Sequence, residues 1–159
     1  MPDMTDPQIT VVSRVVKAPP EAAYRAFLDQ DALVAWLPPG TMQGVVHAFD
    51  AREGGTFRIS LVYPEDEDSP RGKSSARTDT VGGRFVELVP HERIVWATQF
   101  ESADPSFAGE MIVSWTLRPA GSGTEVIVRC ENIPRGIQPE DNEAGSRSTL
   151  EKLAAFLER

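Results

Sequence analysis

The sequence predicts an α+β domain in which a long antiparallel sheet of about six to seven strands is covered by one C-terminal helix. Three observations indicate this. An alternating strand precedes two short helical patterns, which lie between Pro19 and Pro39. A β pattern then fills residues 42–131, and a one-sided helical pattern closes the chain. Because the sheet needs a cover for its apolar face, we expect the last helix to lie across it.

The first two elements follow from β-branched residues and proline stops. Ile9–Ala18 is rich in valine and is predicted to be a strand. Pro19 ends it, and proline is tolerated in the first turn of the helix that follows. That helix is expected over Pro20–Leu28, because Tyr24, Phe27 and Leu28 share one face.

A second short helix repeats this spacing. Asp29 or Asp31 is the expected N-cap, because an aspartate oxygen accepts hydrogen bonds from exposed backbone N–H groups. Leu33, Trp36 and Leu37 form its apolar stripe, and the following Pro-Pro-Gly ends it.

The middle of the chain alternates apolar and polar residues, as half-buried strands do. Paired glycines at Gly82-Gly83 predict a bulge or a close approach. The charged segment Pro64–Lys73 is predicted to be a solvated hairpin loop. The expected strands are Val45–Asp50, Phe57–Tyr63, Ser74–Val89, Arg93–Glu101, Glu110–Arg118 and Thr124–Glu131.

The last helix is expected over Asp141–Glu158, where Leu150, Leu153 and Leu157 fall on one stripe. At 1.5 Å per residue it would be about 24 Å long, enough to cross the sheet. A curved sheet around one helix leaves space between them, and ligand sites favour such concave apolar clefts.

Composition restricts the function classes. The 159 residues carry a net charge of −8, which argues against nucleic acid and against anionic membrane surfaces. A single cysteine, Cys130, excludes an internal disulfide and fits a reducing compartment. The N-terminus lacks a signal-peptide pattern, and no apolar run reaches membrane-spanning length. We therefore expect a cytoplasmic protein, with a flexible tail over residues 1–8 and a single domain over residues 9–159.

Aromatic and small residues are the main candidates for a ligand site. Aromatic side chains from the second helix and the central strands could converge on a pocket or simply fill the core. Small residues early in the last helix could leave room for a ligand. The candidates are Trp36, Phe57, Ile59, Phe85, Glu87, Trp96, Trp115, Ser146, Thr149, Leu150 and Leu153.

No standard catalytic, metal or nucleotide motif is present in the sequence. His47 and His91 are far apart in sequence, and Cys130 is expected in the core. Strand charges such as Arg58, Glu87 and Glu110 should face solvent, because an inward charge is costly unless it is paired. An inward one would be a candidate acid or base.

Several segments, in order, resemble the START/Bet v 1-like (SRPBCC) superfamily, in particular the branch described as activator of heat-shock-protein-90 ATPase homologue-like. The resemblance extends over about residues 9–158. The segments are APPEAAYRAFLDQDALVAWLPP, FDAREGGTFRISL, GRFVELVPHERIVWATQF, MIVSWTLRPAGSGTEVIVRCENIP and EAGSRSTLEKLAAFLE.

This resemblance implies a helix-grip fold with a cavity between the sheet and the last helix. It leaves three functions open. The first is a protein that binds a hydrophobic or aromatic small molecule. The second is a polyketide cyclase or aromatase-like enzyme, cyclase/dehydratase-like and without metal or nucleotide cofactor. The third is a chaperone ATPase-activator-like interaction module, in which the charged loop would contact the chaperone.

The lack of a catalytic constellation favours binding over catalysis. We expect no cofactor, a hydrophobic small molecule as partner, no nucleic acid and no membrane insertion. A homodimer stays open, as does a chaperone contact.

Overall fold

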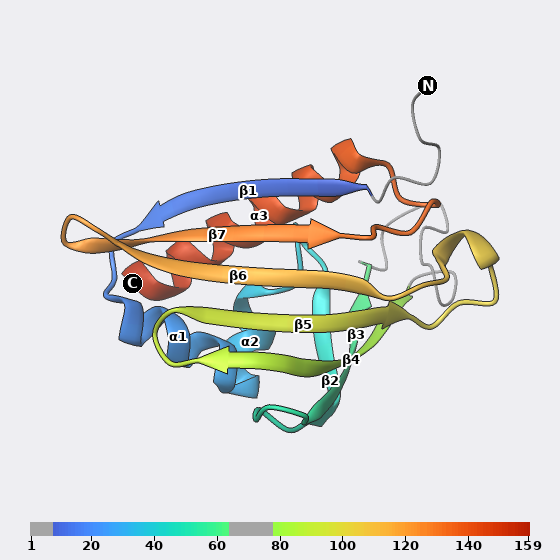
Figure 1. Cartoon of the computed structure of the whole chain (residues 1–159), viewed down its shortest axis with the longest axis horizontal. Helices are drawn as coiled ribbons and strands as arrows, with labels where there is room; N and C mark the ends of the chain where they lie inside the picture. The colour runs from blue at the N-terminus through green and yellow to red at the C-terminus, as the bar shows by residue number, and fades with distance from the viewer. Residues whose placement is uncertain (1–7, 64–77) are drawn as a thin grey trace.

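The computed structural model describes residues 8–63 and 78–159, which form a curved antiparallel sheet with a long helix across its concave face (Figure 1). The sheet has seven strands in the order β1-β7-β6-β5-β4-β3-β2. The strands are β1 (Ile9–Val16), β2 (Gln43–Phe49), β3 (Thr56–Val62), β4 (Thr78–Val89), β5 (Arg93–Phe100), β6 (Met111–Ala120) and β7 (Gly123–Glu131). The helices are α1 (Pro20–Leu28), α2 (Gln30–Trp36), α3 (Pro139–Glu158) and the 3-10 turn η1 (Pro105–Phe107). This is the helix-grip fold that the sequence predicts.

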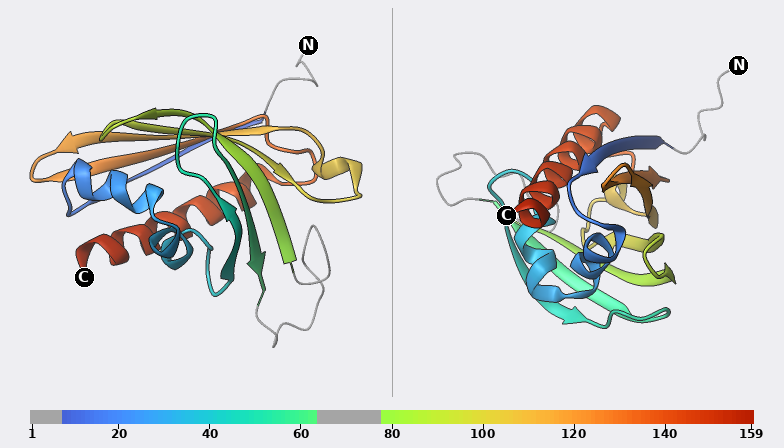
Figure 2. Two further views of the ribbon diagram at one scale, coloured as in Figure 1. Left: turned by 90° about the horizontal axis from the view of Figure 1, so that it is seen from below. Right: turned by 90° about the vertical axis from the view of Figure 1, so that its left-hand side faces the viewer.

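The two short helices begin and end as their sequences predict. Pro20 occupies the first turn of α1. A backbone N–H at this position would have no acceptor within the helix, so proline, which lacks one, fits there. Asp29, rather than Asp31, caps α2, because its Oδ1 accepts from the N–H of Asp31 at 2.9 Å. In Figure 2 both helices lie at one end of the sheet beside α3. They thus close that end of the fold.

Two bulges shape the sheet. One lies in β2, between Val46 and Ala48, and the other in β4, between Phe85 and Glu87. Neither glycine of the Gly82-Gly83 pair forms the bulge, but Gly83 lets the ring of Phe57 approach the backbone of β4 closely. A Cβ on Gly83 would lie 2.6 Å from the ring of Phe57.

The core lies between the sheet and the helices and is centred on aromatic rings. Phe27 packs at 4.7 Å from Trp36 and at 5.1 Å from Trp115, measured between ring centroids. Trp96 lies 5.6 Å from Trp115 and continues the cluster into β5. These edge and tilted contacts are the geometry that aromatic pairs prefer, so α1 and α2 are fixed to the central strands.

Some expectations differ from the structure or fall outside it. Helix α3 begins at Pro139 rather than Asp141, since proline fits a first helical turn. The turn η1 was not predicted; Asp104 caps it by accepting from the N–H of Ser106 at 2.9 Å. The expected tail, apart from Gln8, and the charged loop 64–73 lie outside the described residues.

Candidate functional site

A pocket of about 640 Å³ lies between the concave face of the sheet and the first half of α3. Strands β3 to β7 supply its floor, and residues of the α2–β2 and β7–α3 loops complete the wall. Most of the lining is aromatic or aliphatic. Its floor includes Phe57, Ile59, Trp96, Val113, Trp115 and Val128.

Alternation along the strands places these side chains in the pocket. On β5, Trp96 and Thr98 share the concave face, whereas Ala97 between them faces outward. On the opposite wall, α3 presents Gly145 and Ser146. A Cβ on Gly145 would meet nothing within 4 Å. The small residues of α3 therefore leave this part of the pocket wall without side-chain bulk.

Two tryptophan N–H groups in this wall have no acceptor. The Nε1 atoms of Trp96 and Trp115 are buried and make no hydrogen bond. Trp36, the third tryptophan, donates from Nε1 to the carbonyl oxygen of Ala26 at 3.0 Å. A buried donor without an acceptor costs about 1–3 kcal/mol, so each of these two indole groups lowers the stability of the fold locally.

A small polar cluster lies where α3 meets β1 and β7. Thr10 donates a short hydrogen bond to Asn142, and both lie beside the thiol of Cys130. Burial raises the pKa of this thiol, and hydrogen bonds with Asn142, Thr10 and Ser146 offset only part of the rise. The thiol is therefore protonated near neutral pH and is a poor nucleophile.

One carboxylate in the pocket is buried. Asp79 is only 4% exposed, and the hydroxyl of Tyr63 donates to its Oδ2 at 3.4 Å. Sequence reasoning missed this residue. The signal was available, because Asp79 has the same two-residue phase as Phe85, an inward residue of the same strand.

Helix α3 also holds the loop that follows α2. Thr149 donates to the carbonyl of Leu37 at 3.0 Å, and Ser148 accepts from the N–H of Gly40 at 2.8 Å. Lys152 donates to the carbonyl oxygens of Pro38 and Gly40. Leu37 itself lines the pocket, so these bonds fix one of its walls.

The structure places the predicted site residues in three groups. Those that line the pocket are Phe57, Ile59, Trp96, Trp115, Ser146 and Thr149. Four others are buried in the core away from the lining: Trp36, Phe85, Leu150 and Leu153. Glu87 is in neither group. A role in ligand binding stays a prediction for all of them.

Glu87 faces outward because of the bulge in β4. It has the same phase as the inward Phe85, but the bulge at Val86 reverses the alternation. Its carboxylate pairs with Arg93 at 2.9 Å on the outer face. Glu110, which directly precedes β6, likewise pairs with Arg84 of β4 at 2.7 Å.

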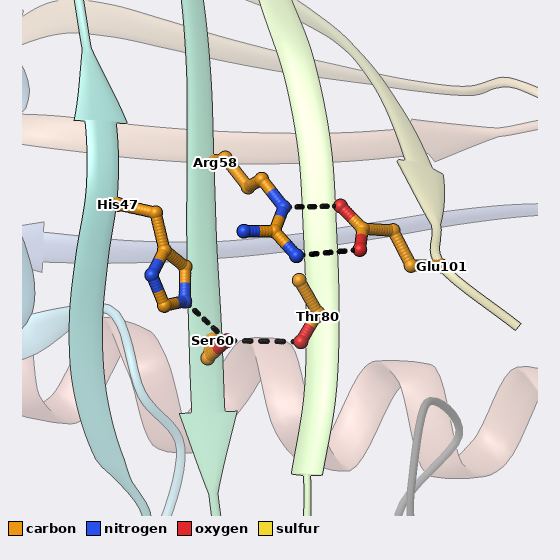
Figure 3. A network of polar contacts seen from close by, with 5 residues as sticks. All are labelled: His47, Arg58, Ser60, Thr80 and Glu101. Carbon is orange, nitrogen blue, oxygen red and sulfur yellow. Dashed lines mark hydrogen bonds and ion pairs between the residues drawn. The ribbon is translucent and has the colours of Figure 1, made fainter.

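A second polar network lies on the face of the sheet away from α3 (Figure 3). Arg58 and Glu101 form a two-point ion pair, with Nη2 and Oε1 2.8 Å apart. This pairing lowers the pKa of Glu101. Nearby, the hydroxyl of Ser60 lies 2.7 Å from His47 Nε2 and 2.9 Å from the hydroxyl of Thr80. These contacts join β2, β3 and β4 to one another and tie β3 to Glu101, which directly follows β5.

This outer network is not arranged for nucleophilic chemistry. Ser60 is 7% exposed, and its hydroxyl is held between two partners. Among the described residues, no His, Cys, Asp and Glu side chains gather in a group of three that could hold a metal ion. The pocket is therefore the better candidate for a functional site.

Fold and pocket together define a helix-grip domain with a partly open, mostly apolar site between sheet and helix. A sequence model of the family described as Activator of Hsp90 ATPase homolog 1-like protein matches residues 17–158. The chain therefore belongs to this family. Membership supports a ligand-binding or protein-interaction role in general terms.

Solved structures of several bacterial proteins are similar to this one. Protein CV1439 from Chromobacterium violaceum is 36% identical, with 95% of this chain and 97% of that chain covered and a TM-score of 0.84. Protein Mll3558 from Rhizobium loti is 23% identical, with 95% and 97% covered and a TM-score of 0.72. A protein from Rhizobium leguminosarum is 20% identical, with 97% and 96% covered and a TM-score of 0.73. The last two likenesses concern the fold alone.

No curated protein matches the chain. In the part of the chain that the structure describes, every helix is too short or too polar to cross a membrane.

Proposed function

We propose that the pocket between the sheet and α3 binds a small, largely apolar molecule. The pocket itself carries this proposal: its volume of about 640 Å³ lies within the usual range for small-molecule sites. Phe57, Trp96 and Trp115 offer ring faces, against which a planar or alicyclic ligand can pack.

Gly145 gives a direct test, because its position in the pocket wall has room for a side chain. We expect Gly145→Leu to fill the space and to weaken binding of a neutral aromatic probe, naphthalene-2-methanol, by at least about tenfold. The matched control is Gly145→Ala, which makes the same helix-favouring change but adds only one methyl group. Isothermal titration calorimetry measures both affinities.

Native mass spectrometry of the purified protein provides a second readout, since a retained ligand adds mass. The proposal fails if the wild-type protein neither binds the probe nor carries a bound mass. It also fails if Gly145→Leu and wild type bind the probe equally well.

The two alternatives have less support. A cyclase or aromatase would need an acid or base in the pocket. Arg58, Glu87 and Glu110 pair with partners on the outer face, which leaves Asp79 and Asp141 as the acidic residues of the described lining. The chaperone-type alternative depends on the charged loop 64–73, which lies outside the described residues. We therefore place ligand binding first.

A further inference from the structure

Polar side chains gather at one end of the mostly apolar pocket. Asn142 and Ser146 lie one turn apart on α3, and Cys130 lies on β7; all three line the pocket. Hydrogen bonds with Asn142 and Ser146 tie the thiol of Cys130 into the same group. The pocket therefore has a polar end in addition to its aromatic floor.

The strand register places this polar end beside Trp115. Val128 of β7 lies opposite Trp115 of β6, and Cys130 lies two residues further along β7, opposite Val113. Two residues of a strand span about 7 Å. A two-ring molecule that packs on Trp115 therefore reaches the polar end without leaving the pocket.

Thr10 of β1 holds the Asn142 side chain in a defined orientation. Thr10 lies opposite Cys130 in the strand pairing, and its hydroxyl donates to Oδ1 of Asn142. This bond occupies the amide oxygen, so the two N–H donors of Nδ2 are left for the thiol, which is a weak acceptor, and for a ligand. Asn142 is half-buried, so its amide is only partly hydrated.

Hydrogen-bond donors predominate at the polar end. Asn142 offers Nδ2, Ser146 offers a hydroxyl, and Cys130 offers a protonated thiol, which is a weak donor. A carbonyl oxygen accepts from such groups and carries no proton of its own. A ligand that buries a carbonyl here recovers the hydrogen bonds that it loses from water, whereas a ligand without an acceptor leaves the donors of the site unpaired.

We propose that Asn142 is a specificity-determining residue, positioned by Thr10. The pocket takes a ring molecule that carries a carbonyl oxygen at one end, with this oxygen at Asn142 and Ser146 and the ring on Trp115. This inference rests on the proposed function and narrows its ligand class, because the polar end selects the functional group and the aromatic floor selects the ring.

Two probes of matched shape isolate the contribution of the oxygen. 2-Acetylnaphthalene carries a carbonyl, and 2-isopropenylnaphthalene has a CH₂ group in place of its oxygen. Calorimetric titration gives the ratio of the ketone affinity to the alkene affinity, in which changes of pocket shape largely cancel. We expect Asn142→Leu to lower this ratio about three- to tenfold, which corresponds to one net hydrogen bond, and Ser146→Ala to lower it about twofold.

A matched pair of threonine variants tests the role of Thr10. Thr10→Val removes the hydroxyl that holds Asn142, and Thr116→Val makes the same change on β6, next to Trp115 but on the opposite face of the sheet. We expect Thr10→Val to lower the ratio about two- to fivefold and Thr116→Val to leave it unchanged. Equal ratios in these two variants would overturn the positioning role of Thr10.

Nuclear magnetic resonance of the wild-type protein gives a readout that needs no variant. The chain contains two asparagines, and the second one, Asn132, donates from Nδ2 to the carbonyl oxygen of Glu110 outside the described lining. The side-chain NH₂ protons of Asn142 should lie further downfield in the ketone complex than in the alkene complex. Those of Asn132 should not differ and serve as the internal reference.

The outcomes separate this inference from the proposed function. If both probes bind but Asn142→Leu has the wild-type ratio, or if the Asn142 signals coincide in the two complexes, the inference is wrong and the proposed function stands. If neither probe binds, the proposed function falls and the inference falls with it.

Discussion

The hydroxyl of Thr149 on α3 donates a hydrogen bond of 3.0 Å to the carbonyl oxygen of Leu37, at the end of α2. This bond joins the long helix to the loop that forms one wall of the pocket. The N–H of Gly40 donates to Ser148 from the same loop. Two consecutive α3 residues therefore position a segment that is more than a hundred residues away in sequence.

The Thr149 bond can be removed with little change of shape. Thr149→Val replaces the hydroxyl by a methyl group and leaves the Leu37 carbonyl without this donor. We expect the free energy of unfolding to fall by about 1 kcal/mol, measured by urea denaturation. Thr149→Ser keeps the hydroxyl and serves as the control. A valine variant as stable as the wild type would show that the bond does not hold the loop.

The two glycines of β4 should respond very differently to alanine. A Cβ at Gly83 would lie 2.6 Å from Phe57 Cζ and 2.7 Å from the carbonyl oxygen of Ala97, whereas at Gly82 the nearest atoms are 4.0 Å away. We expect Gly83→Ala to destabilise the protein by about 1–3 kcal/mol or more, because overpacking displaces the backbone and ring. Gly82→Ala is the matched control and should cost less than about 1 kcal/mol. Thermal melting of both variants tests this difference in stability, and equal melting temperatures would contradict the prediction.

Local patterns predicted the short helices well because proline stops and caps act within a few residues. The apolar stripe of Tyr24, Phe27 and Leu28 gave the span of α1, and Asp29 was among the expected caps of α2. Trp96 and Trp115 were expected either to line a pocket or to fill the core, and both lie in the lining, where no register shift interrupts the pairing of β5 with β6. Such features need no knowledge of tertiary contacts.

Other features depend on contacts that no local pattern contains. The bulge at Val86 turns Glu87 outward, and it interrupts a run that reads as regular alternation. The cluster of Thr10, Asn142 and Cys130 joins three elements whose meeting follows only from the assembled fold. The inward position of Asp79, in contrast, was predictable, because it lies six residues before the inward Phe85 on the same strand.

Trp36 should matter more for stability than any outer strand charge. It is fully buried, packs against Phe27 and donates to the carbonyl of Ala26. Trp36→Ala should cost about 3–5 kcal/mol through the cavity and the lost hydrogen bond. Glu87→Gln removes one half-exposed ion pair and should cost no more than about 1 kcal/mol. Guanidinium denaturation ranks the two variants, and the reverse order would refute the core role of Trp36.

The buried thiol of Cys130 predicts a loss of stability at alkaline pH. Burial raises its pKa in the folded protein, whereas in the unfolded chain the thiol titrates near its ordinary value of about 8.5. The folded state therefore holds more protons between these two values. It follows that the stabilising contribution is fully present below the unfolded-state pKa and is lost as pH rises through the folded-state pKa.

Cys130→Ser isolates this contribution, because serine does not titrate in this range and can keep hydrogen bonds with Thr10, Asn142 and Ser146. We expect the difference in unfolding free energy, wild type minus variant, to be constant up to about pH 8 and to decrease as pH rises further. Urea denaturation under reducing conditions at fixed ionic strength measures it. Tyr24, whose pKa burial also raises, is present in both proteins and cancels in the difference. A difference that stays flat across this range would mean that the thiol reaches solvent and titrates alike in both states.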